Sequence, residues 1–131
     1  MIGVVVISHG KLSYEMVNSA KMILGDTEQI EWEGIMPGDT PDQFLSRIRE
    51  AVKRVNTGDG VIALVDLYGG TPGNAVARLA QEIDMKIVTG VNLPMLIYAV
   101  SERESVGSAE EMARGLLEAG IKGIREFSLG I

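Results

Sequence analysis

Residues 2–10 read IGVVVISHG, a nearly continuous apolar run that ends in a serine, a histidine and a glycine. Parallel strands in the middle of a sheet are covered on both faces and carry such runs, so we expect a central strand at residues 2–7. Consecutive parallel strands need long crossover connections, which are usually helices. The run therefore predicts an α/β domain with His9 just beyond the end of a central strand.

Short β-branched runs alternate with longer segments of helical periodicity along the rest of the chain, as in parallel sheets joined by helices. We expect three more parallel strands, at residues 29–33, 61–65 and 86–89. The first of these alternates in polarity, which places it nearer a sheet edge. A last short strand is expected at residues 123–129. Because no repeat or linker interrupts the pattern, a single domain covering residues 1–131 is expected.

The first two expected helices have clear start or stop signals. Residues 13–24 carry one apolar stripe, and Gly25 follows as a stop. Residues 40–43 combine a threonine, a proline at the first helical position and a glutamine, which is a capping box. The second helix therefore starts there and ends at residues 56–58.

Three further helices are expected in the second half of the chain. Thr71 followed by Pro72 is one helix start. Pro94 opens another over residues 95–100, where a strand is the alternative. Residues 108–111 form a second capping box, which starts the last helix.

The composition excludes several classes of function. The chain has 131 residues, and its 12 basic and 18 acidic side chains give a net charge of −6 with no basic cluster, which argues against a nucleic-acid partner or an anionic membrane surface. It has no cysteine, so we expect neither disulfides nor a thiol nucleophile, and a cytoplasmic location is the default. Its apolar runs are far shorter than the roughly 20 residues of a membrane-spanning helix, and its start lacks the charged region of a signal peptide, so no membrane insertion is expected.

Chemically capable residues cluster where an open parallel sheet binds its ligands, beyond the carboxyl ends of the strands. His9, the only histidine, lies between Ser8 and Gly10. A histidine satisfied within a loop is the plain alternative, but the neighbouring glycine would let a phosphoryl group approach closely. A nucleophilic imidazole needs one free nitrogen and a carboxylate that orients the other, and Asp66 is the candidate. Alternatively, Asp66 only caps its own turn.

The segment 69–71 precedes a helix, so its amides and the helix dipole could bind a phosphate, although a well-capped helix start is the simpler reading. Asn92, which stands two residues before a proline, has a turn or helix-start role as its alternative. No nucleotide-binding or dinucleotide-binding glycine motif is present, and one histidine without cysteine is too few ligands for a transition metal. We therefore expect phosphoryl chemistry on histidine, with no cofactor and no metal.

Three motifs together carry a resemblance to a known family. They are IGVVVISHGK at residues 2–11, VDLYGGTPGN at 65–74 and GVNLPM at 90–95, with a weaker match at 32–39. The chain resembles the IIA component of the mannose family of the phosphoenolpyruvate-dependent sugar phosphotransferase system. The resemblance spans essentially the whole chain and implies a three-layer sandwich, with a four-stranded parallel sheet, a short antiparallel C-terminal strand and helices on both faces.

The resemblance also implies a function: a phosphotransferase with a phosphohistidine intermediate. His9 Nε2 would accept a phosphoryl group from the phosphocarrier HPr and give it to a cognate IIB protein. Asp66 would orient the imidazole, while Gly70 and Thr71 would bind the phosphoryl oxygens. Ser8, Gly10, Tyr68 and Asn92 would support the site or contact partners. A homodimer is implied, in which the last strand can either be exchanged between the partners or stay with its own chain. Membrane association only through the IIC/IID permease complex is implied as well.

Two alternatives to the sugar phosphocarrier remain at this point. The phosphotransfer subunit of dihydroxyacetone kinases is similar, but its turn after the third strand is of a Gly-Ser-Ala type, whereas residues 69–72 here read GGTP. A non-catalytic regulatory or small-ligand module of the same fold is the other alternative. Sugar specificity lies in the membrane components, so the resemblance does not select a sugar.

Overall fold

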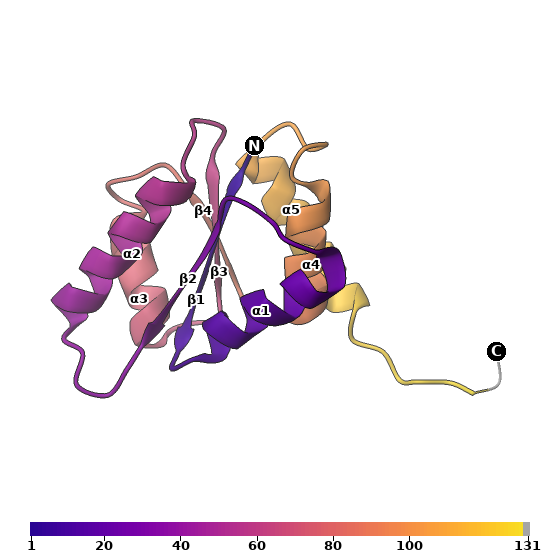
Figure 1. Ribbon diagram of the computed structural model, residues 1–131, viewed down its shortest axis with the longest axis horizontal. Helices are drawn as coiled ribbons and strands as arrows, with labels where there is room; N and C mark the ends of the chain where they lie inside the picture. Colours follow the sequence, from indigo (N-terminus) through magenta and orange to yellow (C-terminus); the bar gives the residue numbers. More distant parts are fainter. Residues whose placement is uncertain (130–131) are drawn as a thin grey trace.

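The computed structural model describes residues 1–129 as one sheet between two layers of helices (Figure 1). The strands, all parallel, are β1 (Gly3–His9), β2 (Ile30–Ile35), β3 (Val61–Val65) and β4 (Lys86–Thr89). The helices are α1 (Leu12–Leu24), α2 (Pro41–Val55), α3 (Gly70–Leu79), α4 (Leu93–Glu102) and α5 (Ala109–Lys122). The predicted α/β class, four parallel strands and helices on both faces are confirmed.

The strand order β2-β1-β3-β4 places the two most apolar strands in the centre. β1 and β3 are buried along nearly their whole length, whereas β2 lies at one edge and is only partly buried, as its alternating sequence predicted. His9 pairs with Ile35 of β2, and Ile7 pairs with Val65 of β3. These registers bring the carboxyl ends of the three strands to one rim of the sheet.

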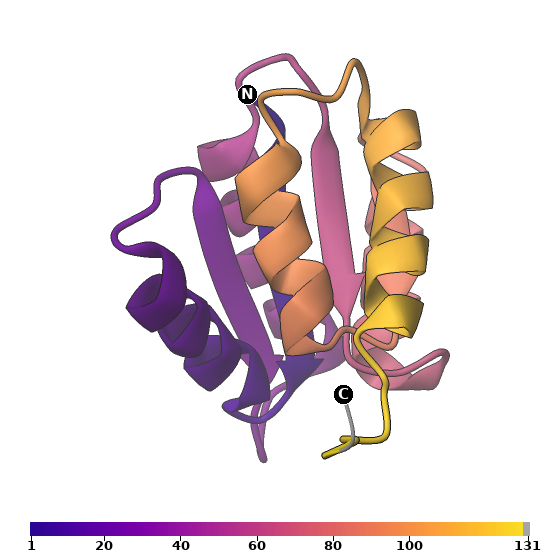
Figure 2. The ribbon, with the colours of Figure 1, turned by 90° about the vertical axis from the view of Figure 1, so that its right-hand side faces the viewer.

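Side chains that alternate along the strands supply two separate cores. On one face, α2 and α3 pack on Val5, Ile7, Val61, Ala63 and Val65. On the other, α1, α4 and α5 pack on Ile2, Val4, Val6, Ile62, Leu64 and Val88, and Figure 2 shows these three helices in front of the sheet. Burial of both faces explains why β1 reads as a continuous apolar run.

Most helix starts follow the predicted caps. Thr40 and Gln43 form both halves of the capping box at α2, and Ser108 caps α5 by accepting from the Glu111 N–H. The Glu111 carboxylate, however, accepts from the Gly107 N–H, so the reciprocal half of that predicted box is displaced by one residue. Residues 95–100 belong to helix α4, and the strand alternative is wrong there.

The start of α3 differs from the prediction. The helix begins at Gly70, after an N-cap at Gly69 that makes no side-chain hydrogen bond, rather than at a Thr71 cap. Gly69 and Gly70 both have positive φ, 87° and 77°, which glycine adopts without steric cost. The backbone conformation of the two glycines therefore sets the helix start.

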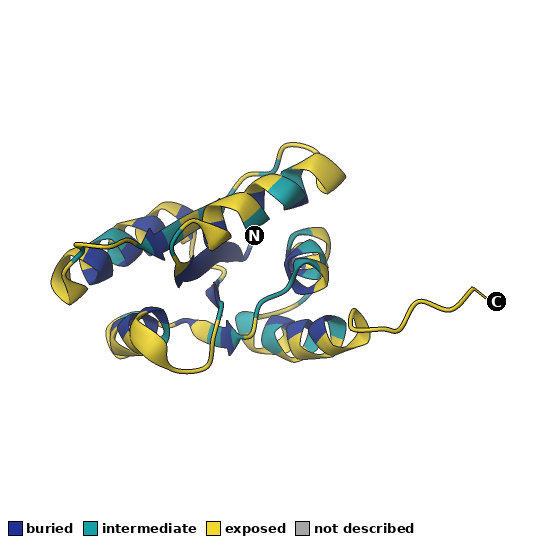
Figure 3. Cartoon of the chain, turned by 90° about the horizontal axis from the view of Figure 1, so that it is seen from below, coloured by how far each residue is buried: buried dark blue, intermediate teal, exposed yellow. Residues whose placement is uncertain are grey.

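The last predicted strand is absent from the described part of the chain. Residues 124–129 leave α5 as an extended segment without strand pairing and run away from the body of the domain (Figures 1 and 3). A strand needs a neighbour to receive its backbone hydrogen bonds, and this segment has none within residues 1–129. None of the helices in that range combines the length and apolarity that crossing a bilayer would demand.

Candidate functional site

His9 and Asp66 meet at the carboxyl rim of the sheet, as the sequence predicted. Asp66 Oδ2 accepts a hydrogen bond from the His9 backbone N–H at 2.9 Å and lies 2.8 Å from His9 Nδ1. An ionised carboxylate can only accept, so the neutral form of the ring carries its proton on Nδ1 and its lone pair on Nε2. The imidazole is 49% exposed while the carboxylate is 8% exposed, so the free nitrogen is accessible and its support is sheltered.

The carboxyl group of Asp66 is held in its charged form. Burial acts to raise the pKa of Asp66, but the backbone N–H of His9, the His9 ring and its charge, and the Leu67 N–H together lower the pKa below its ordinary value of 3.8. Asp66 Oδ1 accepts from that Leu67 N–H at 2.9 Å, so both carboxylate oxygens have partners. Asp66 therefore carries a negative charge beside Nδ1 at neutral pH.

The first turn of α3 faces the imidazole. A Cβ atom at Gly70 would lie 3.4 Å from His9 Cε1 and 3.6 Å from Nε2, so the glycine leaves this space open. The first N–H groups of a helix lack intrahelical partners, and its N-terminus carries partial positive charge. Gly70 and Thr71 provide two such groups, and no acidic residue lies in the first turn. A helix N-terminus of this kind can bind an anion, and this one lies next to Nε2.

Ser8 and Gly10 lie directly on either side of His9. They contact Ser13 and Gly34, two residues that the sequence analysis missed. Ser8 is buried, and its Oγ accepts from the Ser13 N–H at 2.8 Å. Gly10 has a φ of +57°, and its N–H donates to Ile35 O at 2.8 Å. A Cβ atom at Gly34 would lie 1.8 Å from Gly10 O, so only glycine permits this approach of β2.

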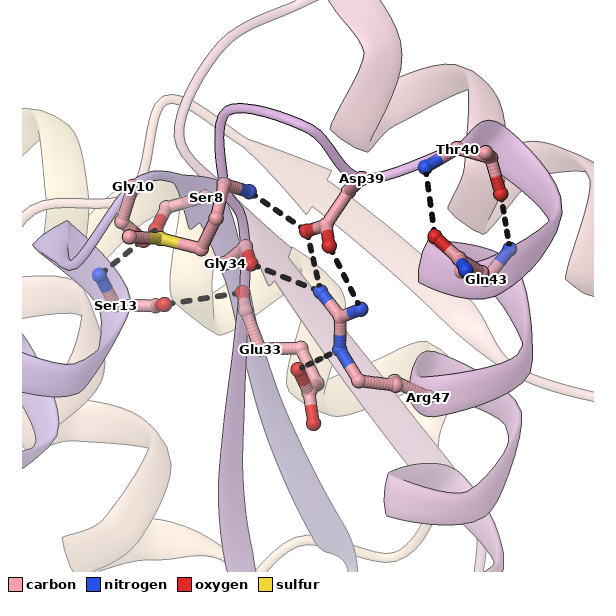
Figure 4. Close-up of polar contacts among 10 residues, drawn as sticks. Ser8, Gly10, Ser13, Glu33, Gly34, Asp39, Thr40, Gln43 and Arg47 are labelled. Atoms are coloured by element: carbon pink, nitrogen blue, oxygen red, sulfur yellow. Dashed lines mark hydrogen bonds and ion pairs between the residues drawn. The ribbon is translucent and has the colours of Figure 1, made fainter.

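A second missed group extends the support beyond β2 (Figure 4). Arg47 of α2 donates to Asp39 Oδ2 at 2.8 Å, to Glu33 Oε2 at 3.1 Å and to Gly34 O at 3.2 Å. The Arg47 guanidinium holds the pKa of Asp39 below its usual value, together with the Met36 N–H that donates to the same carboxylate. In the sequence, Arg47 is one of several basic residues on the polar face of an amphipathic helix. That pattern does not indicate which residues it contacts.

The remaining two candidates lie outside the immediate site. The Tyr68 side chain is 94% exposed in the loop before α3, where it is free to meet another molecule. Asn92 caps α4 by accepting from the Met95 N–H and donates to Gly120 O of α5, both at 3.0 Å. Asn92 thus has the structural helix-start role that was its alternative.

The arrangement can bring an electrophile to Nε2 and surround it with N–H donors. Within residues 1–129, no group of His, Asp and Glu side chains is arranged to hold a metal ion. The groups that the site does provide are an accessible ring nitrogen, a buried carboxylate that stabilises positive charge on the ring, and a helix N-terminus. Together they suit transfer of a phosphoryl group to and from histidine.

Comparison with known proteins identifies the family. A family model described as "PTS system fructose IIA component" matches residues 3–116. This chain belongs to that EIIA family. The match confirms the resemblance drawn from the three motifs, two of which contain His9 and Asp66.

Individual relatives agree with this EIIA assignment. The chain is 29% identical over 125 residues to the mannose-specific EIIAB component of Escherichia coli (strain K12), covering 95% of this chain but only 39% of that protein. It is 32% identical over 105 residues to the fructose-specific EIIA component of Bacillus subtilis (strain 168), covering 79% of this chain and 72% of the relative. The crystal structure of phosphotransferase system component EIIA from Streptococcus agalactiae superposes with a TM-score of 0.89 at 25% identity, over 97% of this chain and 98% of that one.

Proposed function

We propose that this EIIA chain is a phosphocarrier: it accepts a phosphoryl group from phospho-HPr on His9 Nε2 and passes it to a cognate IIB protein during sugar uptake. The observation that carries the proposal is that Asp66 Oδ2 accepts hydrogen bonds from both the backbone N–H and the Nδ1 atom of His9. Nε2 is left free beside the N-terminus of α3. Family membership supports the same role. The proposed unit is one EIIA domain over residues 1–131, acting in the cytoplasm without a cofactor.

The proposed step needs no proton transfer at His9. The Nε2 lone pair attacks the phosphorus in line as the bond from phosphorus to the donor nitrogen breaks, and the electron pair of that bond returns to the HPr imidazole. The His9 ring keeps its Nδ1 proton and becomes positively charged, which the Asp66 carboxylate stabilises. The phosphoryl oxygens meet the N–H groups of Gly70 and Thr71. Transfer to IIB is the same step in reverse, with the IIB side chain as the acceptor.

The proposal includes a homodimer with exchanged C-terminal segments. β4 is an edge strand, and it borders a hollow of about 530 Å³ whose lining includes Ile87 and Val88 of β4 and Leu117 of α5, together with residues of α3 and the loop before it. The segment 124–129 is extended, and Phe127 in it is 85% exposed. An edge strand with unpaired backbone groups accepts another strand readily. This segment of a second copy, as an antiparallel strand on β4, would bury both surfaces.

Intact-mass measurement tests the carrier function. The protein is incubated with phosphoenolpyruvate, enzyme I and HPr, beside a His9→Ala variant, and each sample is measured again after mild acid treatment. We expect one acid-labile phosphoryl adduct on the wild type and none on the variant. An equal adduct on folded His9→Ala protein would refute the assignment of the acceptor. No adduct on either protein, with HPr shown to be charged, would favour the regulatory or ligand-binding module instead.

A further inference from the structure

The turn that contains His9 is linked to α1 and to β2 by hydrogen bonds of two buried serines (Figure 4). Ser8 and Ser13 are both fully buried. The Ser13 N–H donates to Ser8 Oγ at 2.8 Å, Ser13 Oγ donates to Glu33 O at 3.0 Å, and Ser8 Oγ donates to Gly10 O at 3.3 Å. Hydroxyls buried away from water rely on such partners, so each of these bonds fixes a separate backbone segment.

The connection replaces an ordinary helix cap. Lys11, the N-cap residue of α1, makes no side-chain hydrogen bond, and the hydroxyl of Ser8 caps the helix from inside β1 instead. The Gly34 backbone lies against Gly10 O in the same region, and Gly34 O in turn accepts from Arg47. The end of β1, the first turn of α1 and the end of β2 therefore meet at Ser13.

The geometry at Asp66 depends on the backbone of this turn. One oxygen, Oδ2, accepts from the backbone N–H and from the ring of the same residue, so the position of the His9 backbone fixes where Nε2 points. Ser8 and Gly10, on either side of His9, are the residues that the serine hydrogen bonds tie down. A reacting atom misplaced by about 1 Å can slow a reaction about a hundredfold.

We propose that Ser13 is a positioning residue for phosphoryl acceptance: its hydroxyl, bonded to Glu33 O, holds the first turn of α1 and, through the Ser13 N–H on Ser8 Oγ, the His9 turn, so that Nε2 faces the N-terminus of α3. The inference rests on the proposed function of His9 as the acceptor. Ser13 acts only through the backbone, because its hydroxyl is directed at β2 rather than at the ring.

The test compares Ser13→Ala with wild type, using two phosphoryl donors. Phospho-HPr reports docking and chemistry together, whereas phosphoramidate, a small donor, reports the readiness of the ring without docking. We expect the single-turnover rate of Ser13→Ala to fall at least about tenfold with both donors. The concentration of phospho-HPr that gives half of the maximal rate should not change. We also expect the NMR signal of the Nδ1 proton to exchange faster with water, because its bond to Asp66 is weakened.

A matched control separates positioning from loss of stability. Val55→Ala shortens a buried side chain at the far end of α2 and destabilises the core without touching the turn. It should keep the wild-type rate and the wild-type Nδ1 signal. If Ser13→Ala does not fold, Ser13→Cys keeps the side-chain size, replaces the hydroxyl with a weak donor, and should show the same changes to a smaller degree.

The outcomes are distinguishable. Wild-type rates and an unchanged Nδ1 signal in folded Ser13→Ala protein would overturn the positioning role, as would equal slowing in Val55→Ala. Failure of wild-type protein to take a phosphoryl group from either donor would overturn the proposed function. The Nδ1 exchange rates would then still show whether Ser13 positions the ring.

Discussion

Asp66 binds His9 twice through one oxygen, and this sets what a single substitution at residue 66 would change. An asparagine there can donate as well as accept, so it no longer selects the tautomer with Nδ1 protonated. It also carries no charge to stabilise the phosphorylated ring. We expect Asp66→Asn to fold and to accept phosphate more slowly than wild type by about tenfold to a thousandfold, measured as a single-turnover rate.

The lowered pKa of Asp66 gives a dependence of stability on pH. A carboxyl group whose pKa is lower in the folded than in the unfolded state stabilises the fold above the unfolded pKa, and this contribution is lost as pH falls through the folded pKa. The free energy of unfolding of wild type relative to Asp66→Asn should therefore be constant above about pH 5 and decline below about pH 4. Denaturant titrations at a series of pH values measure the difference. A difference that grows on acidification would contradict the charged state assigned to Asp66.

Gly70 and Gly69 form a matched pair for testing the anion site. Both have positive φ, so alanine at either position costs about 1 kcal/mol or more of backbone strain. Only at Gly70 does the added methyl group lie next to Nε2; at Gly69 nothing lies within 4 Å. Gly70→Ala should therefore slow phosphorylation of His9 by at least about tenfold, whereas Gly69→Ala should slow it little. Equal rates in the two variants would show that the space in front of Nε2 is not where the phosphoryl group lies.

His9, Asp66 and Gly70 could be predicted from the sequence because topology alone brings strand ends and helix starts to one rim. Ser13, Gly34 and Arg47 could not. Their roles depend on how closely β2 approaches the turn after β1, and a serine or glycine within an element gives no sign of that distance. The sequence analysis identified the proposed acceptor and the residues beside its ring, and it missed the residues of α1 and β2 that contact the turn and the arginine of α2 that is bonded to β2.

At the level of elements, local signals predict all four strands and all five helices of the described chain. Apolar runs and capping residues are local signals, so they can be recognised in the sequence without knowledge of the fold. Two boundaries shifted, one for a non-local and one for a local reason. β2 extends to Ile35 because β1 offers it a pairing partner, and α3 begins at Gly70 because positive φ at two glycines reverses the chain there.

The contact between β2 and the turn after β1 predicts a strong effect of one methyl group. Gly34→Ala would place a Cβ atom 1.8 Å from Gly10 O, so the strand or the turn must move. Such overpacking costs about 1–3 kcal/mol of unfolding free energy, and we expect reduced phosphorylation as well. Thermal and denaturant unfolding measure the first effect.

Gly73 of α3 is the control for Gly34. A Cβ atom there would meet only Leu67 O, at the ordinary distance of 3.6 Å, and Gly73 lies inside a helix. Gly73→Ala should leave the protein as stable as wild type or up to about 1 kcal/mol more stable, because alanine is the better helix former. A Gly34→Ala variant that is no less stable than Gly73→Ala would refute the close contact.

For the whole molecule, the segment 124–129 predicts how the protein associates. These residues are exposed, so removing residues 124–131 should leave the domain folded but shift the protein from dimer to monomer. Sedimentation velocity over a range of concentrations measures this shift. Phe127→Asp is a milder variant that should weaken the dimer in the same direction. A truncated chain that dimerises as well as the full chain would refute segment exchange.

β1 is bordered by a strand on each side, and this position also determines how rarely the strand opens. Amide hydrogens of central strands exchange with solvent only when most of a domain opens, so the part of the chain that presents His9 belongs to the slowest-opening region. We expect nearly every molecule to be competent at every collision, with no rearrangement to await. The rate of phosphoryl transfer between the proteins is then set by how often they collide.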